Sequence, residues 1–405
     1  FDQLQKISSP EHNYAENGFV AATRSEEIKC PDLEVNVLIS MENVTDRVIG
    51  AATKDMDKSE ALKARREMIS KIELENAGDE SQRADVVNLY NGGEYWLYKY
   101  KKYTDVRLVM APERALAYFG GDYDNFTFPR WNLDFTLFRV YEDGKPLKSE
   151  NFLEWNLDGP KENDLTIVMG NPGHTRRSST YAQLLYSRDF SSPLSLKIID
   201  ERIRIAREYS KLGEEQRRRA LDEIMMLENS RKARAGAYQG LLNEQILNRK
   251  KAEEQEFMRL VAANPEFQKE YGSVWKEIEY LLDKQNANLK RNSLSYNMYS
   301  GLASIALTMA EYATEIEKPD SDRKAGFHDF ELEELKFYLL SPAPIYKDFE
   351  IATMSGMLNL AVKEIGSNDE FLTKLLGGKS PESLAKELIG GTRLDDPEYR
   401  KKLIE

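Results

Sequence analysis

Short runs dominated by hydrophobic and aromatic residues recur through the first 180 residues, with turn-forming residues between them. Runs of this length and composition predict β-strands. The later runs follow one another without a long helical pattern between them, which favours a barrel or a sandwich. A charged segment with one apolar side predicts a surface helix at residues 53–77. Strands are expected at residues 34–39, 95–103, 105–110, 134–141 and 165–169, with 95–103 and 105–110 paired in an antiparallel meander.

The pattern changes near residue 180, where apolar residues begin to recur three and four positions apart. Ile199, Ile203 and Ala206 are one example of this spacing, which predicts amphipathic helices. Helices are expected within residues 194–260, from Asn264, along Leu302 to Ile316, at 349–365, 368–376 and 380–389, and from 397. No repeat of fixed length occurs in the sequence. The sequence therefore predicts an α+β protein with a β-rich domain at 1–180 and an irregular helical domain at 181–405.

Composition and charge exclude several classes of function. The formal net charge of −12 leaves no basic excess to neutralise phosphates, so no nucleic-acid partner is expected. No apolar run in the sequence approaches the length of a membrane span. The single cysteine, Cys30, cannot form an internal disulfide, and it forms no zinc-binding cluster with histidines. We therefore expect a globular protein without a metal or a cofactor.

The stretch from residue 118 to 141 carries the candidate chemistry. Gly120 and Gly121 can adopt positive φ, and the acidic and amide side chains after them are typical of a turn. Asp134 stands where this loop meets an expected strand whose apolar run indicates cover on both faces. Such a position can hold a partly buried carboxylate beside a partner. An aspartate that only caps the turn before a strand fits the same pattern, so the sequence leaves both roles open.

A sequence motif in this stretch supports a second interpretation. Residues 124–130, Asp-Asn-Phe-Thr-Phe-Pro-Arg, are followed four residues later by Asp134-Phe135 and then by a strand ending in Phe-Arg-Val-Tyr. This arrangement resembles serine-peptidase family 46, the bacterial dipeptidyl aminopeptidases. The resemblance spans nearly the whole chain, because segments 5–14, 170–175, 340–346 and 390–394 also occur in the family's order.

The resemblance implies a fold and a reaction. Family members have a chymotrypsin-like catalytic domain of two β-barrels, with a large α-helical domain inserted between the barrels. The intact enzymes remove dipeptides from oligopeptides with free N-termini through an acyl-enzyme. They are exported, so a periplasmic or secreted location is expected, and a homodimer is compatible with the resemblance. Their catalytic histidine and serine would lie before Phe1 and after Glu405, so these 405 residues alone are expected to be inactive.

The resemblance also assigns roles to particular residues. Asp134 matches the triad aspartate, which would orient a histidine and stabilise its imidazolium form. Asn125 and Phe126 match the asparagine and the aromatic residue that hold the substrate's α-ammonium group. Asn229 matches an asparagine that the helical domain sends into the cleft. From the residues alone, Asn125 could instead support the glycine turn, and Asn229 could be a polar residue on an exposed helix face.

The chain departs from the better-known members around this motif. It has Phe126 and Phe128 where they have tryptophan, and it has Trp131, Asn132 and Leu133 where they have His-Thr-Gly. These differences keep the triad aspartate in register and alter the expected shape of the amine site.

A protein without catalytic activity is the competing hypothesis. An acidic helical bundle on a β-module could bind peptides or protein partners without any chemistry. Sequence outside this chain distinguishes the two, because the enzyme requires a His-His-Cys segment upstream and a Gly-x-Ser-Gly segment downstream.

Overall fold

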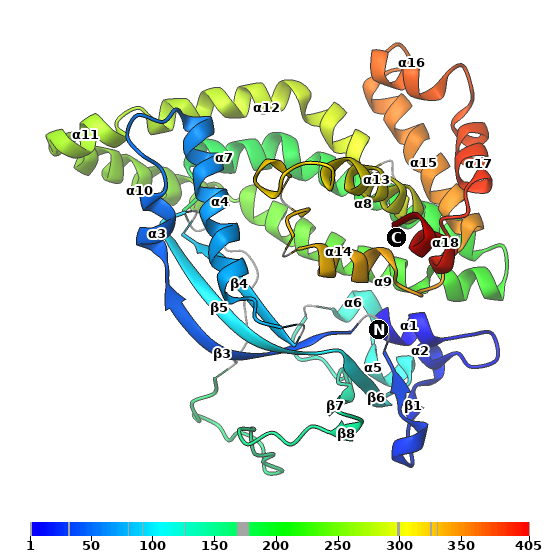
Figure 1. Cartoon of the computed structure of the whole chain (residues 1–405). Coiled ribbons are helices and arrows are strands. Elements are labelled where there is room, and N and C mark those ends of the chain that lie inside the picture. The colour runs from blue at the N-terminus through cyan, green and yellow to red at the C-terminus, as the bar shows by residue number, and fades with distance from the viewer. Residues whose placement is uncertain are drawn as a thin grey trace.

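The computed structural model describes residues 2–30, 33–79, 81–90, 92–125, 127–167, 178–297, 300–324, 326–329 and 331–404. Within these residues the first part of the chain forms two antiparallel sheets, and the second part is helical from residue 181 (Figure 1). Most of the later helices lie on one side of the sheets, while segment 147–167 runs away from the helices at the bottom of the view. The chain therefore combines sheets and helices, as predicted.

One sheet is built around a single long strand that pairs on both sides. Its strands are β6 (Asp105–Ala111), which pairs with β1 (Phe19–Val20), β2 (Ile28–Lys29) and β7 (Leu137–Glu142), and β8 (Lys145–Pro146), which pairs with β7. A short 3-10 helix, η1 (Arg24–Glu26), lies between β1 and β2. Helices α1 (Asp2–Ile7) and α2 (Tyr14–Asn17) supply Leu4 and Ala15 to the core of this sheet. Cys30 is fully buried in the same core, and burial raises the pKa of its thiol.

The second sheet is covered on one face by two helices. Its strand order is β3 (Val35–Asn43), β5 (Glu94–Tyr103), β4 (Gln82–Leu89), and the helices are α3 (Thr45–Gly50) and α4 (Lys58–Asn76). Val48, Ile72 and Leu97 are buried together between the helices and the sheet. The Asp57 side chain accepts the Glu60 N–H at 2.9 Å, and the Glu60 side chain accepts the Asp57 N–H at 2.9 Å, which starts α4. The helix predicted at 53–77 is thus confirmed over residues 58–76, and residues 53–57 precede it as turns.

The meander predicted for residues 95–110 is wrong, because β5 and β6 belong to different sheets. Thr104 alone separates these strands. The shortest common hairpin loops have about two residues, so one residue is too few for the chain to turn back. The chain therefore runs on from one sheet into the other at this residue. Strand β4 was not predicted, although the Asn91-Gly92 dipeptide between β4 and β5 is a hairpin signal in the sequence.

Strand β7 begins at Leu137, so Asp134 lies before the strand and not at its start. Leu137 and Phe138 are 45% and 41% exposed, and the prediction of a strand covered on both faces is therefore wrong. The second half of β7 is held more firmly, because Arg139 Nε and Tyr141 OH donate to the Glu27 carboxylate at 2.8 and 2.7 Å. Burial raises the pKa of Glu27, but these two hydrogen bonds outweigh it and lower that pKa.

The segment after β8 exposes large apolar side chains. Phe152, Trp155 and Leu157 are 74%, 80% and 89% exposed. Residues 165–167 are irregular, with Leu165 88% exposed, so the strand predicted at 165–169 is wrong over these positions. Residues 168 and 169 lie outside the described residues.

The second part of the chain is an irregular bundle of helices around one main core. Asn264 caps one helix by accepting the N–H groups of Glu266 and Phe267, as its Asn-Pro start predicts. Ile205, Met357 and Leu358 belong to the main core. The helices are α7 (Tyr181–Tyr186), continued by a π-helix (Ser187–Ser191), α8 (Ser192–Ser210), α9 (Glu214–Leu241), α10 (Glu244–Ala263), α11 (Pro265–Tyr271), α12 (Val274–Asn297), α13 (Gly301–Glu315), a 3-10 helix (Asp320–Asp322), α14 (Leu332–Leu339), α15 (Lys347–Ile365), α16 (Glu370–Leu376), α17 (Pro381–Gly391) and α18 (Pro397–Ile404).

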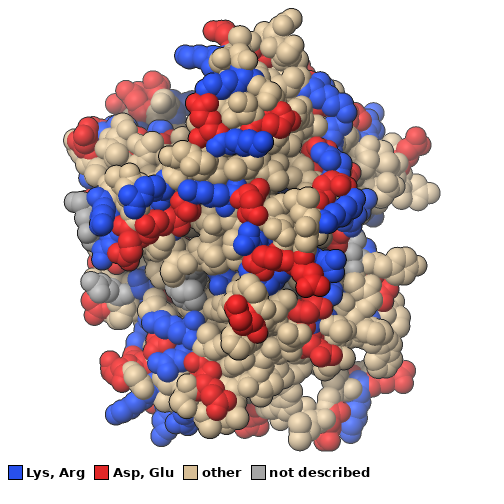
Figure 2. Space-filling view, turned by 90° about the vertical axis from the view of Figure 1, so that its right-hand side faces the viewer, with Lys and Arg blue, Asp and Glu red and all other residues tan. Residues whose placement is uncertain are grey.

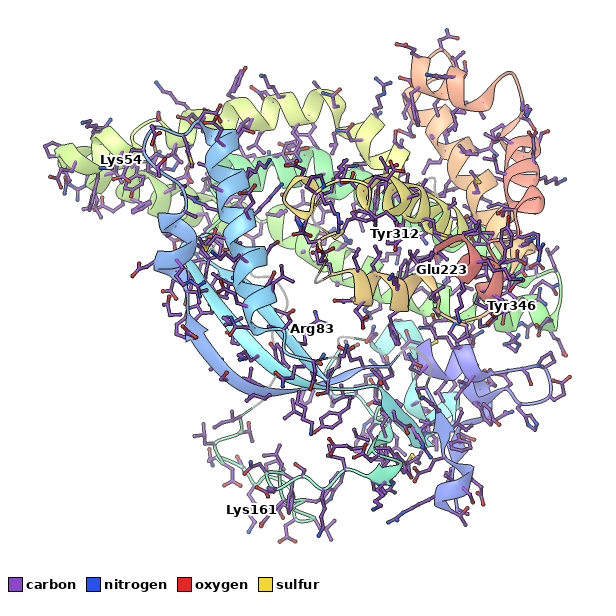
Figure 3. The ribbon with its side chains drawn as sticks, in the orientation of Figure 1. Lys54, Arg83, Lys161, Glu223, Tyr312 and Tyr346 are labelled. Atoms are coloured by element: carbon purple, nitrogen blue, oxygen red, sulfur yellow. The ribbon has the colours of Figure 1, made fainter. Side chains whose placement is uncertain are left out.

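Arg218 joins the helical part to the N-terminal segment. It lies near the start of α9 and is only 7% exposed. Its Nη1 donates to the Ser8 carbonyl at 3.2 Å, its Nη2 donates to the Tyr346 hydroxyl at 3.2 Å, and its own carbonyl accepts Gln5 Nε2 at 2.7 Å. Tyr346 lies beside α9, close to the N-terminal helices (Figure 3). Segments 5–14 and 340–346, which are far apart in the sequence, thus meet at one buried guanidinium.

Arg400 joins two further segments near the end of the chain. Its side chain is 1% exposed, and its guanidinium donates to the carbonyls of Leu339 and Leu394, both at 2.6 Å, and of Ser341. The Arg400 guanidinium therefore holds segments 340–346 and 390–394 together. It can only donate hydrogen bonds, and in these contacts every acceptor is a backbone carbonyl.

Charges of both signs are interspersed on the surface shown in Figure 2, without a broad basic patch on that face. None of the described helices is long and apolar enough to cross a membrane. In the part of the chain that the structure describes, no group of three or more His, Cys, Asp or Glu side chains is arranged to hold a metal ion.

Candidate functional site

The loop that carries the sequence motif is fastened at several points. It leaves α5 (Arg114–Ala117) and forms the single turn α6 (Gly121–Asp124). Gly120 has φ of +78°, and a Cβ at this position would lie 2.0 Å from Asp124 Oδ2, so the turn requires glycine there. The Arg114 guanidinium donates to Glu16 at 2.6 and 2.9 Å, which ties α5 to α2. The Leu133 N–H donates to the Leu116 carbonyl at 3.0 Å, which ties the far end of the loop to α5.

Asn125 and Asn229 lie in direct contact. Asn125 Nδ2 donates to Asn229 Oδ1 at 3.0 Å, although 104 residues separate them. One turn further along α9, Lys232 Nζ donates to the Tyr123 carbonyl at 2.7 Å. Positions three apart share a helix face, so one face of α9 holds this loop. Position 218, eleven residues before 229, falls on the same face, since eleven residues make about three turns.

Arg130 completes the contacts of Asn125. Its Nη1 donates to Asn125 Oδ1 at 2.7 Å, and its guanidinium carbon lies 5.4 Å from the centre of the Tyr118 ring. No role for Arg130 or Lys232 was predicted from the sequence. Arg130 could have been found as a donor-only side chain five residues after an asparagine in the same motif.

The structure places Asp134 in an irregular, exposed segment before β7. The sequence-based expectation of a partly buried carboxylate fixed by a strand start is therefore wrong for this chain. The reason is that Phe135, Leu137 and Phe138 beside it are themselves between 41% and 45% exposed, so its surroundings are open on this side. Asp134 is not in the cluster formed by Asn125, Arg130 and Asn229.

The remaining candidates are placed as follows. Phe126 and segment 170–175, including His174, lie outside the described residues. His12 is exposed and its ring stacks on Tyr14 at 5.9 Å. His328 is buried, and its Nδ1–H donates to the Asp320 carbonyl at 2.9 Å. These two histidines thus lie in other local surroundings than the motif loop.

A cavity of about 810 Å³ lies away from these residues, between α4, β4 and segment 328–337. Arg83, labelled in Figure 3, contacts Asp85 at 2.9 Å and Glu334 at 3.5 Å beside it. Glu73 also lines this cavity and is 6% exposed. Its Oε1 accepts the Val86 N–H at 2.7 Å, yet burial raises the pKa of Glu73 to about 7. None of the residues that the family resemblance assigns to catalysis or to amine binding lines this cavity.

Comparison with known proteins identifies relatives over the whole chain. The sequence matches the peptidase S46 family over residues 1–405. Dipeptidyl-peptidase 7 of Capnocytophaga gingivalis is 30% identical over 297 residues, covering 71% of this chain and 41% of that protein. An Asp/Glu-specific dipeptidyl-peptidase of Flavobacterium psychrophilum is 27% identical over 434 residues, covering 100% of this chain and 58% of that protein. The chain thus spans about half the length of these curated relatives.

A solved structure shares the fold. The crystal structure of Porphyromonas endodontalis DPP11 in complex with the dipeptide Arg-Glu matches with a TM-score of 0.74 and 20% identity, covering 100% of this chain and 62% of that one. At this identity the likeness concerns the fold alone. The match over residues 1–405 decides the classification, and the chain belongs to the peptidase S46 family.

Proposed function

We propose that this chain is part of a serine exopeptidase that releases dipeptides from the free N-terminus of oligopeptides. Family membership supports the proposal, together with relatives that are named dipeptidyl-peptidase 7 and Asp/Glu-specific dipeptidyl-peptidase. Catalysis proceeds through an acyl-enzyme, in which a serine attacks the scissile carbonyl and a histidine transfers its proton. The protein acts in the periplasm or is secreted.

In this proposal the two sheets, within residues 1–180, form the first barrel of a chymotrypsin-like catalytic domain. The helices within 181–405 form the insertion that covers its cleft. The exposed apolar side chains of Phe138, Trp155 and Leu165 support the proposal, because a second barrel would bury surface of this kind. The histidine and serine come from outside these 405 residues, so the chain by itself is inactive.

Asp134 serves as the triad aspartate. Its carboxylate accepts the Nδ1–H of the histidine, selects the reactive tautomer and stabilises the imidazolium ion. Its exposure in the present chain is compatible with this role, because the carboxylate is open to an imidazole that another part of the protein brings to it.

The hydrogen bond between Asn125 and Asn229 is the observation that carries the proposal. The resemblance assigns both residues to the site that binds the substrate's α-ammonium, one from the motif loop and the other from a helix. An ammonium group has three N–H donors and needs acceptors, which amide oxygens supply. Phe126 provides the aromatic wall of the same site. This site fixes the N-terminus, so that cleavage falls after the second residue.

The test uses the intact gene product and a pair of fluorogenic dipeptide substrates, one with a free amine and one N-acetylated. The proposal predicts release of the fluorophore from the free amine alone and covalent labelling of the protein by a fluorophosphonate. Binding of peptides without turnover and without labelling would show instead a non-catalytic binding module. Equal cleavage of the two substrates would contradict the amine site.

A further inference from the structure

Arg130 determines which way the Asn125 amide faces. The guanidinium group carries five N–H donors and no acceptor, so it can meet only the oxygen end of an amide. In the structure Arg130 Nη1 donates to Asn125 Oδ1 at 2.7 Å. This contact excludes the flipped amide, in which two sets of donors would face each other.

The orientation of Asn125 then sets that of Asn229. With Oδ1 toward Arg130, Asn125 Nδ2 points to Asn229 and donates to Oδ1 of that residue at 3.0 Å. Each of the two amide oxygens accepts one hydrogen bond in this chain of contacts and keeps a second lone pair. Two acceptors are thus left for the donors of an ammonium group. A flipped Asn125 would present N–H groups that repel it.

The Arg130 guanidinium is partly buried beside an aromatic ring. It lies 5.4 Å from the centre of the Tyr118 ring, and its Nε and Nη2 atoms are buried without a hydrogen-bond partner in the described part of the chain. Buried donors without partners reduce the stability of a fold. The position of the Arg130 side chain is therefore better explained by its hydrogen bond to Asn125 than by a contribution to the stability of the fold.

We propose that Arg130 is a positioning residue of the amine site, which fixes the amide orientation of Asn125 and, through it, of Asn229. The inference rests on the proposed function. Arg130 acts through Asn125 and makes no contact with the reacting atoms. Its loss therefore weakens the hold on the substrate's N-terminus without changing the chemical step.

The test compares Arg130→Met and Arg130→Lys in the intact protein, with the free-amine and N-acetylated substrates. Arg130→Met removes the donor and should raise KM for the free amine ~10-fold, with kcat within ~3-fold, because an anchor used equally in the ground and transition states affects KM. Arg130→Lys keeps a donor-only group and should restore most of the loss. Arg139→Met, which loses the contact with Glu27, is the control for general damage and should lower activity on the free-amine substrate without the rise in KM expected for Arg130→Met.

A double-mutant cycle shows whether Arg130 acts through Asn125. In an Asn125→Ala background, Arg130→Met should change KM by less than ~2-fold, because the amide that it orients is absent. A full additive effect in that background would overturn the inference.

The outcomes separate this inference from the proposed function. A wild-type protein that cleaves both substrates equally would overturn the proposed function and this inference with it. A wild-type protein that prefers the free amine, with an Arg130→Met variant that keeps the same preference and the same KM, would overturn this inference alone. Failure of Arg130→Lys to recover KM would also contradict it, because a donor would then not be sufficient.

Discussion

Asn125 and Asn229 form a hydrogen bond of 3.0 Å that joins the motif loop to the middle of α9. The two residues lie in different parts of the fold, since Asn125 lies in the loop between β6 and β7 and Asn229 belongs to the helical bundle. Together with the contact between Lys232 and Tyr123, this bond fixes how the loop sits on the helix. The position of the loop therefore depends on the docking of α9.

The two asparagines should be energetically coupled. Single Asn125→Ala and Asn229→Ala variants and the double variant should show a coupling free energy of unfolding of about 1 kcal/mol, as expected for one net hydrogen bond. Urea unfolding measures it. Asn248, an exposed residue of α10, is the matched control, and its combination with Asn125→Ala should be additive. Additivity of the 125/229 pair would show that the bond does not form in solution.

Arg218→Met should destabilise the protein by about 3 kcal/mol, because the Ser8 carbonyl loses this buried donor and the Glu215 carboxylate loses one of its two arginine partners, keeping Arg219 at 2.9 Å. The hydrogen bond from Arg218, supported by a further one from Arg219, lowers the pKa of Glu215 to about 2. The stability contributed by that carboxylate is present above the ordinary glutamate pKa and is lost as the pH falls toward 2. The variant should therefore lose less stability than wild type between pH 4.5 and 2.

Thermal unfolding across this pH range measures both effects of Arg218→Met. Arg217→Met is the control, since Arg217 is the exposed neighbour of Arg218 and should change the unfolding free energy by less than about 0.5 kcal/mol. Equal effects of the two substitutions would contradict a specific role of Arg218 in joining α9 to the N-terminal segment.

Glu73→Gln should change how stability depends on pH. Burial raises the pKa of Glu73 to about 7, so the folded state holds this proton more tightly than the unfolded state. Wild-type stability should therefore fall as the pH rises from about 4.5 to 7 and level off above that. The Gln variant should lack this fall and should gain stability over wild type at pH 8 relative to pH 5, by roughly 1–3 kcal/mol.

Denaturant unfolding at pH 5 and pH 8 checks the Glu73 prediction. Glu67→Gln, on the same helix with its side chain 42% exposed, should leave the pH dependence unchanged. A pH dependence that persists in Glu73→Gln would show that another group causes it.

Sequence pattern predicted much of the local structure. Apolar spacing and the Asn264-Pro265 start identified the helices because these signals report on a single element. The pairing of strands was harder to predict, as β5 and β6 show. A run of apolar and aromatic residues predicts a strand, but it does not indicate which other strand pairs with it. The exposure of Leu137 and Phe138 was missed for a related reason. An apolar run indicates side chains that are favoured to be buried, but it does not indicate which residues bury them.

Only part of the candidate site could be predicted from the sequence. The pairing of Asn125 with Asn229 could not be derived from spacing, because 104 residues and a change from loop to helix separate them. The motif resemblance suggested a shared role, and the geometry shows the contact. The hydrogen bond from Arg130 to Asn125 depends on the fold of a loop with no periodic pattern, so only the donor chemistry of arginine pointed to it in the sequence.

Substitution of Asp134 in the intact protein tests whether this carboxylate is the triad aspartate. The measurement is kcat/KM for dipeptide release from a free-amine substrate by wild type and by Asp134→Asn, together with the unfolding temperature of each. Because Asp134 is exposed, the substitution should leave the unfolding temperature unchanged, as should the exposed control Asp158→Asn. We expect Asp134→Asn to lower kcat/KM by about 10⁴-fold and Asp158→Asn to leave kcat/KM unchanged. Turnover near the wild-type rate in a folded Asp134→Asn protein would contradict it.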